Sequence, residues 1–236
     1  MAANRAALDR WAIVPRILRD VSQRNLGVEL FGRRIPAPVL FAPVGAGSLA
    51  APDADALIGR AAAELGVPYI LSNQASVSME DVAAAMDDTS AGAPRWFQLY
   101  WSTDDDLVDS LLERAAAIRA EAVVVTLDTT MLGWRPQDLN LGSLPFAQGE
   151  GIAQYTSDRR FVDIVAERLR GAADERPEIS LGAIATLFSI TRNAPGRFLQ
   201  NLRSPQPRAA VQTFLDIYSR PSLNWDDLAG LRARTA

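Results

Sequence analysis

Between residues 36 and 128 the sequence alternates short β-rich apolar runs with helical patterns, and this alternation constrains the fold more than any other feature. The apolar runs cover residues 38–44, 68–72, 95–101 and 122–128. Strands that are separated by helices pair in parallel, and nearly continuous apolar runs indicate strands buried on both faces. The pattern therefore predicts four β/α units and an α/β fold.

Helical patterns fill the gaps between the runs. The first covers residues 55–65 and ends before Gly66, and the second begins at Ser78, a typical N-cap that acidic residues follow. The third is expected to begin from Ser102 or Thr103. Its apolar residues share one helical face, which predicts burial of Leu107, Val108, Leu111, Leu112 and Ala115.

Two architectures accommodate alternating strands and helices, the doubly wound sheet and the (β/α)₈ barrel. No G-x-G-x-x-G motif follows the first apolar run, which counts against a dinucleotide-binding doubly wound sheet. We therefore predict the TIM-barrel fold, here as a truncated half-barrel of about four β/α units. Because the outer strands of a half-barrel are open edges, we expect it to associate with a missing C-terminal half or with further copies of itself.

The alternation of strand and helix patterns ends after Asp128. Residues 129–160 are typical of a loop, and a Pro- and Arg-rich connector covers 195–207. Helices are expected at residues 161–169, 179–190, about 208–218 and 224–231. We interpret residues 1–236 as one partial catalytic domain that consists of a lead-in at 1–35, the β/α units at 36–128, a long helical insertion forming an extended loop or lid at 129–222, and a helix at 223–236 before a missing fifth strand.

Composition limits the chemistry that these residues can perform. The sequence has no Cys and no His, and all 24 of its basic residues are Arg. It therefore holds no imidazole base, no Ser-His-Asp triad, no Schiff-base lysine and no Cys- or His-type metal site. Asp, Glu and Tyr remain for proton transfer, and we expect a cofactor or groups outside this chain to supply the reactive group.

Charge and hydropathy limit the cellular location and the partners that we expect for the chain. Its 28 acidic residues give a net charge of −4, which argues against a nucleic-acid partner. No apolar run reaches the roughly 18 residues of a membrane span, and the N-terminus lacks the apolar region of a signal peptide. We therefore expect a cytoplasmic protein with no membrane partner.

The ends of the four apolar runs, where barrel enzymes place their functional groups, carry several hydroxyls and amides, and the first three ends carry no charge. Each alone is typical of a strand end satisfied by loop backbone, but together they favour a shared planar ligand with many hydrogen-bonding atoms. Arg135, beyond the fourth run, can clamp a carboxylate or phosphate, or be an ordinary loop arginine. The strand-end residues are Pro43, Val44, Gly45, Ser72, Asn73, Gln74, Gln98, Tyr100, Thr126 and Asp128.

Several ordered segments of the chain resemble the FMN-dependent α-hydroxy-acid oxidoreductases, such as glycolate oxidase. They are W-A-I-V-P-R-I-L-R-D at 11–20, A-P-V-G at 42–45, L-S at 71–72, F-Q-L-Y at 97–100, T-L-D-T at 126–129 and G-W-R-P-Q-D at 133–138. Two later segments, 154–158 and 223–228, are most similar to the lactate 2-monooxygenase branch. The resemblance implies a TIM barrel that binds FMN at its C-terminal mouth and oxidises a small, lactate-like L-2-hydroxy acid, as an oxidase or a monooxygenase.

The same resemblance implies roles for individual residues. The backbone of residues 43–45 would lie against the flavin ring, Ser72, Gln98 and Thr126 would bind its pyrimidine edge, and Tyr100 and Arg135 would face the substrate. The family's His base, strand-five Lys and phosphate-binding loops are not in the sequence. We therefore assign no catalytic residue and no metal ligand, and expect no turnover from this chain alone. The alternative is a non-catalytic or degenerate half-barrel that binds flavin or oligomerises.

Overall fold

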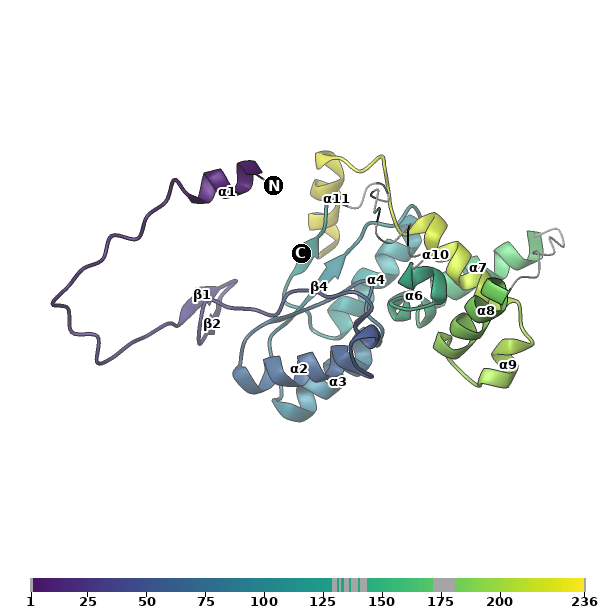
Figure 1. Cartoon of the computed structure of the whole chain (residues 1–236), viewed down its shortest axis with the longest axis horizontal. Coiled ribbons are helices and arrows are strands. Elements are labelled where there is room, and N and C mark those ends of the chain that lie inside the picture. Colours follow the sequence, from purple (N-terminus) through teal and green to yellow (C-terminus); the bar gives the residue numbers. More distant parts are fainter. Residues whose placement is uncertain are drawn as a thin grey trace.

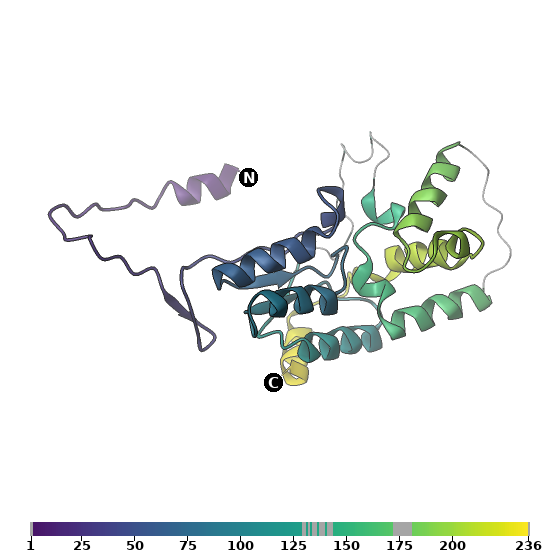
Figure 2. The ribbon, with the colours of Figure 1, turned by 90° about the horizontal axis from the view of Figure 1, so that it is seen from below.

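The computed structural model describes residues 2–128, 131, 133, 136, 140, 144–171 and 181–235. Its central sheet has three parallel strands in the order β3 (Tyr69–Leu71), β4 (Arg95–Leu99) and β5 (Val123–Val125). The helices that precede and connect them lie beside one another along the sheet (Figures 1 and 2). These helices are α2 (Ala54–Leu65), α3 (Met79–Thr89) and α4 (Asp105–Ala117). The described part is therefore an α/β fold whose strands do not close into a barrel.

The first predicted strand is shorter than its apolar run suggests. Residues 38–44 lie beside β3 but make only one parallel bridge, between Phe41 and Tyr69. The Phe41 N–H donates to the carbonyl of Pro68 at 2.9 Å, and its carbonyl accepts from Ile70 N–H at 3.1 Å. Prolines at 36, 38 and 43 flank this bridge, and proline has no N–H to donate to a ladder. The prediction of a full strand was wrong here, although the position and direction of the run were right.

Helix boundaries follow local capping chemistry. The Ser78 hydroxyl accepts from Asp81 N–H at 3.2 Å, so the predicted N-cap of α3 is confirmed. The predicted cap of α4 is wrong, because its N-cap is Asp104, whose carboxylate accepts from Leu107 N–H at 2.8 Å. Ser102 instead donates to the carbonyl of Ile217 at 2.8 Å, which fastens the loop before α4 to a later helix.

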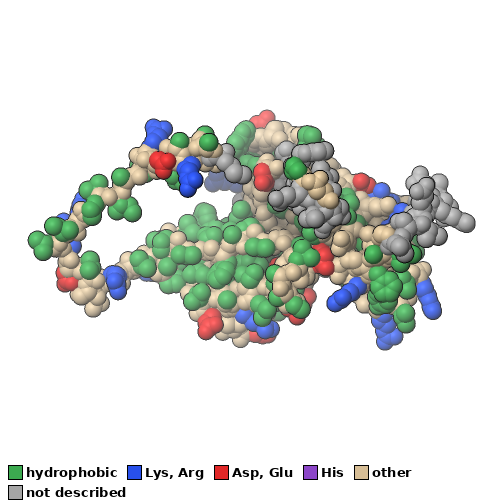
Figure 3. Space-filling model, in the orientation of Figure 1, with side chains coloured by type: hydrophobic (Ala, Val, Ile, Leu, Met, Phe, Trp, Pro, Cys, Tyr) green, Lys and Arg blue, Asp and Glu red, His purple; other side chains and the backbone are tan. Residues whose placement is uncertain are grey.

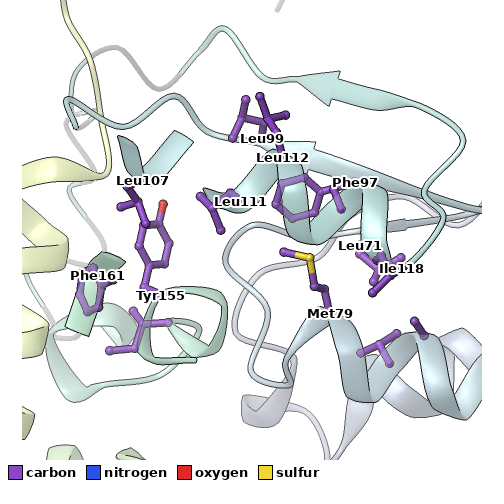
Figure 4. Close-up of a cluster of buried hydrophobic side chains, with 14 of the residues drawn as sticks. Leu71, Met79, Phe97, Leu99, Leu107, Leu111, Leu112, Ile118, Tyr155 and Phe161 are labelled. Carbon is purple, nitrogen blue, oxygen red and sulfur yellow. The ribbon is translucent and has the colours of Figure 1, made fainter. Parts of the chain in front are cut away.

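The main core lies between the sheet and its helices. The predicted apolar face of α4 is buried, as expected. Figure 4 shows Leu111 and Leu112 of this face near Phe97 and Leu99 of β4, with Tyr155 and Phe161 extending the cluster away from the sheet. The core therefore joins the β/α units to the helical region that follows them.

Helices dominate the region after β5. They are η2 (Pro145–Gln148), α6 (Ala153–Thr156), α7 (Arg159–Gly171), α8 (Leu181–Asn193), α9 (Phe198–Leu202), α10 (Gln206–Ile217) and α11 (Trp225–Thr235). The four helices that the sequence predicts there appear as α7, α8, α10 and α11. The short helices η2, α6 and α9 lie where the sequence predicts loop or connector. Phe214 of α10 packs against Phe146, Tyr155 and Tyr218, so an aromatic cluster holds this region together.

The N-terminal part extends away from the body (Figures 1 and 2). It contains α1 (Ala2–Leu8) and an antiparallel hairpin of β1 (Val28–Leu30) and β2 (Arg33–Ile35), which the sequence did not predict. The Phe31 ring packs edge-on against Trp96, and Arg33 pairs with Glu121, so the hairpin attaches near the starts of β4 and β5. Exposed apolar side chains lie along this N-terminal part and on the adjoining surface of the body (Figure 3).

Among the helices of the described residues, none has the length and apolar character needed to cross a membrane.

The cap and ion pair at Asp104 provide a test of the fold. The Arg160 guanidinium, by its hydrogen bond, holds the pKa of Asp104 below its ordinary value of 3.8. The ionised carboxylate therefore stabilises the fold above that pH, and the contribution is lost as the pH falls through the folded pKa. Asp104→Ala should lower the free energy of unfolding by about 1–2 kcal/mol through loss of the cap.

Asp104→Asn is the matched control, because asparagine retains capping ability but not the charge. Urea unfolding near pH 6 and near pH 3 should show its deficit relative to the parent shrinking in acid, since only the parent loses an ion pair there. An equal deficit at both pH values would contradict the assigned pairing with Arg160.

Candidate functional site at the strand ends

Three neutral side chains at the carboxyl ends of the strands form one hydrogen-bonded row, called here the strand-end row. Ser72, directly after β3, donates its hydroxyl to Gln98 Oε1 at 3.0 Å. Gln98, in β4, donates from Nε2 to Thr126 Oγ1, directly after β5, at 2.8 Å. Ser72 and Gln98 are buried and Thr126 is half-buried. The structure therefore brings together the three side chains that the sequence predicts to bind a common ligand.

Strand geometry explains why these residues meet. Side chains alternate between the two faces of a strand. Phe97 and Leu99 enter the core beneath the helices, so Gln98 between them points to the opposite face. The register pairs Gln98 with Val124 of β5, and parallel strands end at the same edge of the sheet. The row is thus a direct product of the pleat and the parallel register.

The strand-end row keeps unused hydrogen-bonding capacity. A glutamine amide has two N–H donors and an oxygen with two lone pairs. Within the row, Gln98 uses one donor to Thr126 and one acceptor site for Ser72. The Thr126 hydroxyl accepts from Gln98 and can still donate its own proton. The row can therefore offer both donors and acceptors to a planar ligand, and it carries no charge.

The backbone segment predicted to accompany the row lies at its β3 end. Pro43 is half-buried, and Val44 and Gly45 are exposed. The next residue, Ala46, donates its N–H to the carbonyl of Gln74 at 2.8 Å, which fixes this segment to the loop after β3. A Cβ atom at Gly45 would lie 3.3 Å from Gln74 Cβ, tighter than ordinary contact. Glycine therefore allows the two loops to approach closely.

Of the two residues predicted to face the substrate, Tyr100 and Arg135, the structure describes only Tyr100. Tyr100 follows β4 and is half-buried. Burial raises the pKa of Tyr155, and the nearby Tyr100 adds to this rise. Arg135 lies outside the described residues.

Sequence reasoning missed the side chains that hold the loop after β3 in place. Gln154 of α6 is fully buried; its Oε1 accepts from Met79 N–H at 2.9 Å, and its Nε2 donates to the carbonyls of Val77 at 3.2 Å and Ser72 at 3.4 Å. Its neighbour Tyr155 accepts from Asn73 Nδ2 at 2.5 Å. The segment 154–158 was part of the resemblance, but nothing in its residue types indicated these contacts.

A buried carboxylate holds the same loop from the other side. Asp55, near the start of α2, accepts from Ser76 N–H at 2.9 Å and from Val77 N–H at 3.2 Å. Burial raises the pKa of Asp55, and these two bonds oppose the rise. Since α2 and α6 both bind this loop, the position of Ser72 depends on side chains far from it in the sequence.

Comparison with known proteins identifies the family. The model of the FMN-dependent dehydrogenases matches residues 1–236. The chain belongs to this FMN-dependent dehydrogenase family. The resemblance drawn from the sequence is thereby confirmed, and with it the expectation of FMN as the family's cofactor.

Similar enzymes from bacteria and fungi match part of the chain. The L-lactate oxidase of Lysinibacillus sphaericus is 40% identical over 159 residues, which cover 67% of this chain and 40% of that enzyme. The FMN-dependent alpha-hydroxy acid dehydrogenase qulF of Penicillium citrinum is 43% identical over 161 residues, which cover 68% of this chain and 39% of that protein. The chain thus matches about two fifths of the length of each of these relatives.

Solved structures place the fold among the same enzymes. Mandelate oxidase with (S)-4-hydroxymandelic acid superposes with a TM-score of 0.65 at 28% identity, over 99% of this chain and 52% of that chain. A second mandelate oxidase structure, with benzoyl-formic acid, gives a TM-score of 0.57 at 34% identity over 73% of this chain and 50% of that one. These neighbours are TIM barrels, so the predicted fold family is supported while the described strands form only a partial α/β sheet.

Two buried tyrosines offer a matched test of the loop contacts. Tyr155→Phe removes the partner of the buried Asn73 amide and should lower the free energy of unfolding by about 1–3 kcal/mol. Tyr69→Phe removes an equally buried hydroxyl that has no hydrogen-bond partner among the described residues, and should leave stability unchanged or slightly raised. Urea unfolding at neutral pH measures both. Equal losses in the two variants would show that the Asn73 contact does not stabilise the loop.

Proposed function

We propose that the strand-end row binds the pyrimidine edge of FMN in a protein that oxidises a small L-2-hydroxy acid. The observation that carries the proposal is the hydrogen-bonded row of Ser72, Gln98 and Thr126 across three parallel strands. Membership of the FMN-dependent dehydrogenase family supports it.

The residues present fit the flavin ring. The pyrimidine edge of the ring alternates carbonyl acceptors with an N–H donor, and the row offers neutral donors and acceptors in return. Its neutrality matches the uncharged ring and not the phosphate of FMN. Gly45, which has no side chain, is exposed at the β3 end of the row, so its backbone would allow one face of the ring to approach closely.

In this proposal, the residues of this chain bind and orient the flavin ring and the substrate. FMN, when bound, supplies the two-electron acceptor that no side chain of the sequence provides. Ser72, Gln98 and Thr126 would hold the ring, and the backbone of Pro43, Val44 and Gly45 would lie against it. Arg135 would bind the substrate carboxylate, and Tyr100 would face the substrate. The sequence has no His, so we assign removal of the substrate proton to a group outside this chain.

The substrate class follows from the relatives. Their names specify L-lactate and 4-hydroxymandelate, both 2-hydroxy acids. We assign a lactate-like acid to this chain, with oxidase or monooxygenase chemistry completed by a further segment or a separate chain that supplies the missing groups.

A second candidate function is binding of flavin without catalysis. The residue composition favours it, because the 236 residues contain no His to remove the substrate proton. The two candidates share the ring site and differ in turnover, so separate experiments address them.

The ring site is tested by FMN titration, with visible absorbance and flavin fluorescence as readouts. Gln98→Ala and Thr126→Val should each weaken FMN binding about tenfold, since each loses hydrogen bonds worth roughly 1–1.5 kcal/mol. Gln200→Ala and Thr103→Val are controls with the same kinds of substitution at exposed positions, and should bind FMN as the parent does. Unchanged affinity in a folded Thr126→Val variant, which keeps the side-chain shape, would exclude the proposed role of the row.

Turnover distinguishes the two candidate functions. We expect L-lactate to leave FMN oxidised when mixed anaerobically with the purified chain, because the chain holds no imidazole to remove the substrate proton. The measurement is flavin absorbance followed over time against free FMN. Reduction faster than that of free FMN would show that this chain is catalytically complete and would leave the assignment of an outside base wrong.

A further inference from the structure

A cavity of about 160 Å³ lies in the helical region, between α7, α10 and the chain that follows α8. Its walls are buried apolar side chains from four segments: Ile152, Phe161, Val165, Ile190, Ala210 and Val211. The exposed residues Val162, Pro195 and Gln206 form its rim, so a ligand can enter without opening the core. None of the residues of the strand-end row lines it.

The side-chain donors of Thr156 and Asn201 in the cavity wall already have partners. The Thr156 hydroxyl donates to the carbonyl of Ile152 at 3.3 Å. Asn201 Nδ2 donates to the carbonyls of Ala194 and Pro195, each at 3.1 Å. No charged side chain is among the lining residues. A carboxylate or phosphate placed here would lose its hydration without gaining a counter-charge, so the cavity disfavours both a 2-hydroxy acid and the phosphate of FMN.

The size of the cavity and the arrangement of the aromatic rings beside it limit the class of ligand further. An apolar cavity of about 150 Å³ lined by Leu, Ile and Phe admits benzene. Beside this cavity, aromatic rings follow one another at tilted or edge-on angles, with centroids 4.8 Å apart for Tyr155 and Phe214 and 5.5 Å apart for Tyr155 and Phe161. A further ring next to Phe161 would continue that series, and such pairs gain energy beyond the area that they bury.

We propose that this cavity is a binding site for a neutral, single-ring aromatic molecule. The site is separate from the flavin site and does not depend on the proposed function, because it rests only on the helical region. Through Phe161 and Tyr155 it adjoins the Asn73 contact, so its occupant packs against the aromatic cluster that positions the loop after β3.

Toluene and benzoate are matched probes, since they share a ring and differ in charge. Titration of the 236-residue chain should show saturable binding of toluene by calorimetry and a rise in melting temperature that follows its concentration. Toluene should also shift the methyl NMR signals of Ile152, Val165 and Val211. Benzoate at equal concentration should do neither. Absence of saturable toluene binding, or equal binding of benzoate, would overturn the proposal.

Cavity variants locate the site. Ala210→Leu adds methyl groups that fill the cavity and should weaken toluene binding at least about tenfold, a loss of roughly 1.4 kcal/mol. Ala166→Leu makes the same change on the exposed face of α7 and should bind toluene as the parent does. Val165→Ala enlarges the cavity and should raise the affinity for p-xylene relative to toluene. Unchanged toluene affinity in folded Ala210→Leu, or an unchanged ratio in Val165→Ala, would place binding elsewhere and overturn the assignment.

Discussion

The loop after β3 contains buried backbone groups, and the hydrogen bonds that satisfy them determine the geometry of the candidate site. Buried N–H and C=O groups are costly without partners. Here the partners are side chains rather than a neighbouring strand: Asp55 accepts from the N–H groups of Ser76 and Val77, and Gln154 binds Met79 N–H and the carbonyls of Ser72 and Val77. Because one residue comes from α2 and the other from α6, Ser72 can take its place only when the helical region has packed against the β/α units.

This dependence explains why the region after β5 is more than a covering for the sheet. Its aromatic cluster packs around Phe214, and Tyr155 in that cluster reaches back to Asn73 at the end of β3. Asp158, fully buried, accepts from Ser110 Oγ at 2.8 Å and from Arg114 Nη1 at 3.1 Å on α4. The helical region therefore binds both the loop after β3 and the helix α4, which follows β4. A change in its packing reaches the strand-end row through these contacts.

The sequence predicted those features that depend on local pattern. Alternation and helical periodicity gave β3, β4, α3 and the buried face of α4, and the strand-end positions of Ser72, Gln98 and Thr126 followed from them. The first strand was overpredicted, because its apolar residues carry β propensity while its prolines lack the N–H groups of a ladder. The cap at Asp104, the hairpin and the contacts of Gln154 were missed for another reason. They depend on which distant segment supplies a partner, and residue type alone does not encode that choice.

Unused hydrogen-bonding capacity distinguishes the two sites. In the strand-end row, Gln98 keeps a free donor and a free acceptor position after its bonds to Ser72 and Thr126, so a polar planar ligand gains bonds there that it would otherwise make to water. In the helical cavity, the side-chain donors of Thr156 and Asn201 bind backbone carbonyls, and the buried wall is mostly apolar. A ligand would gain mainly dispersion and burial of apolar surface in that cavity. The two proposed ligands therefore differ in polarity, and the described residues of the strand-end row and of the cavity wall carry no formal charge.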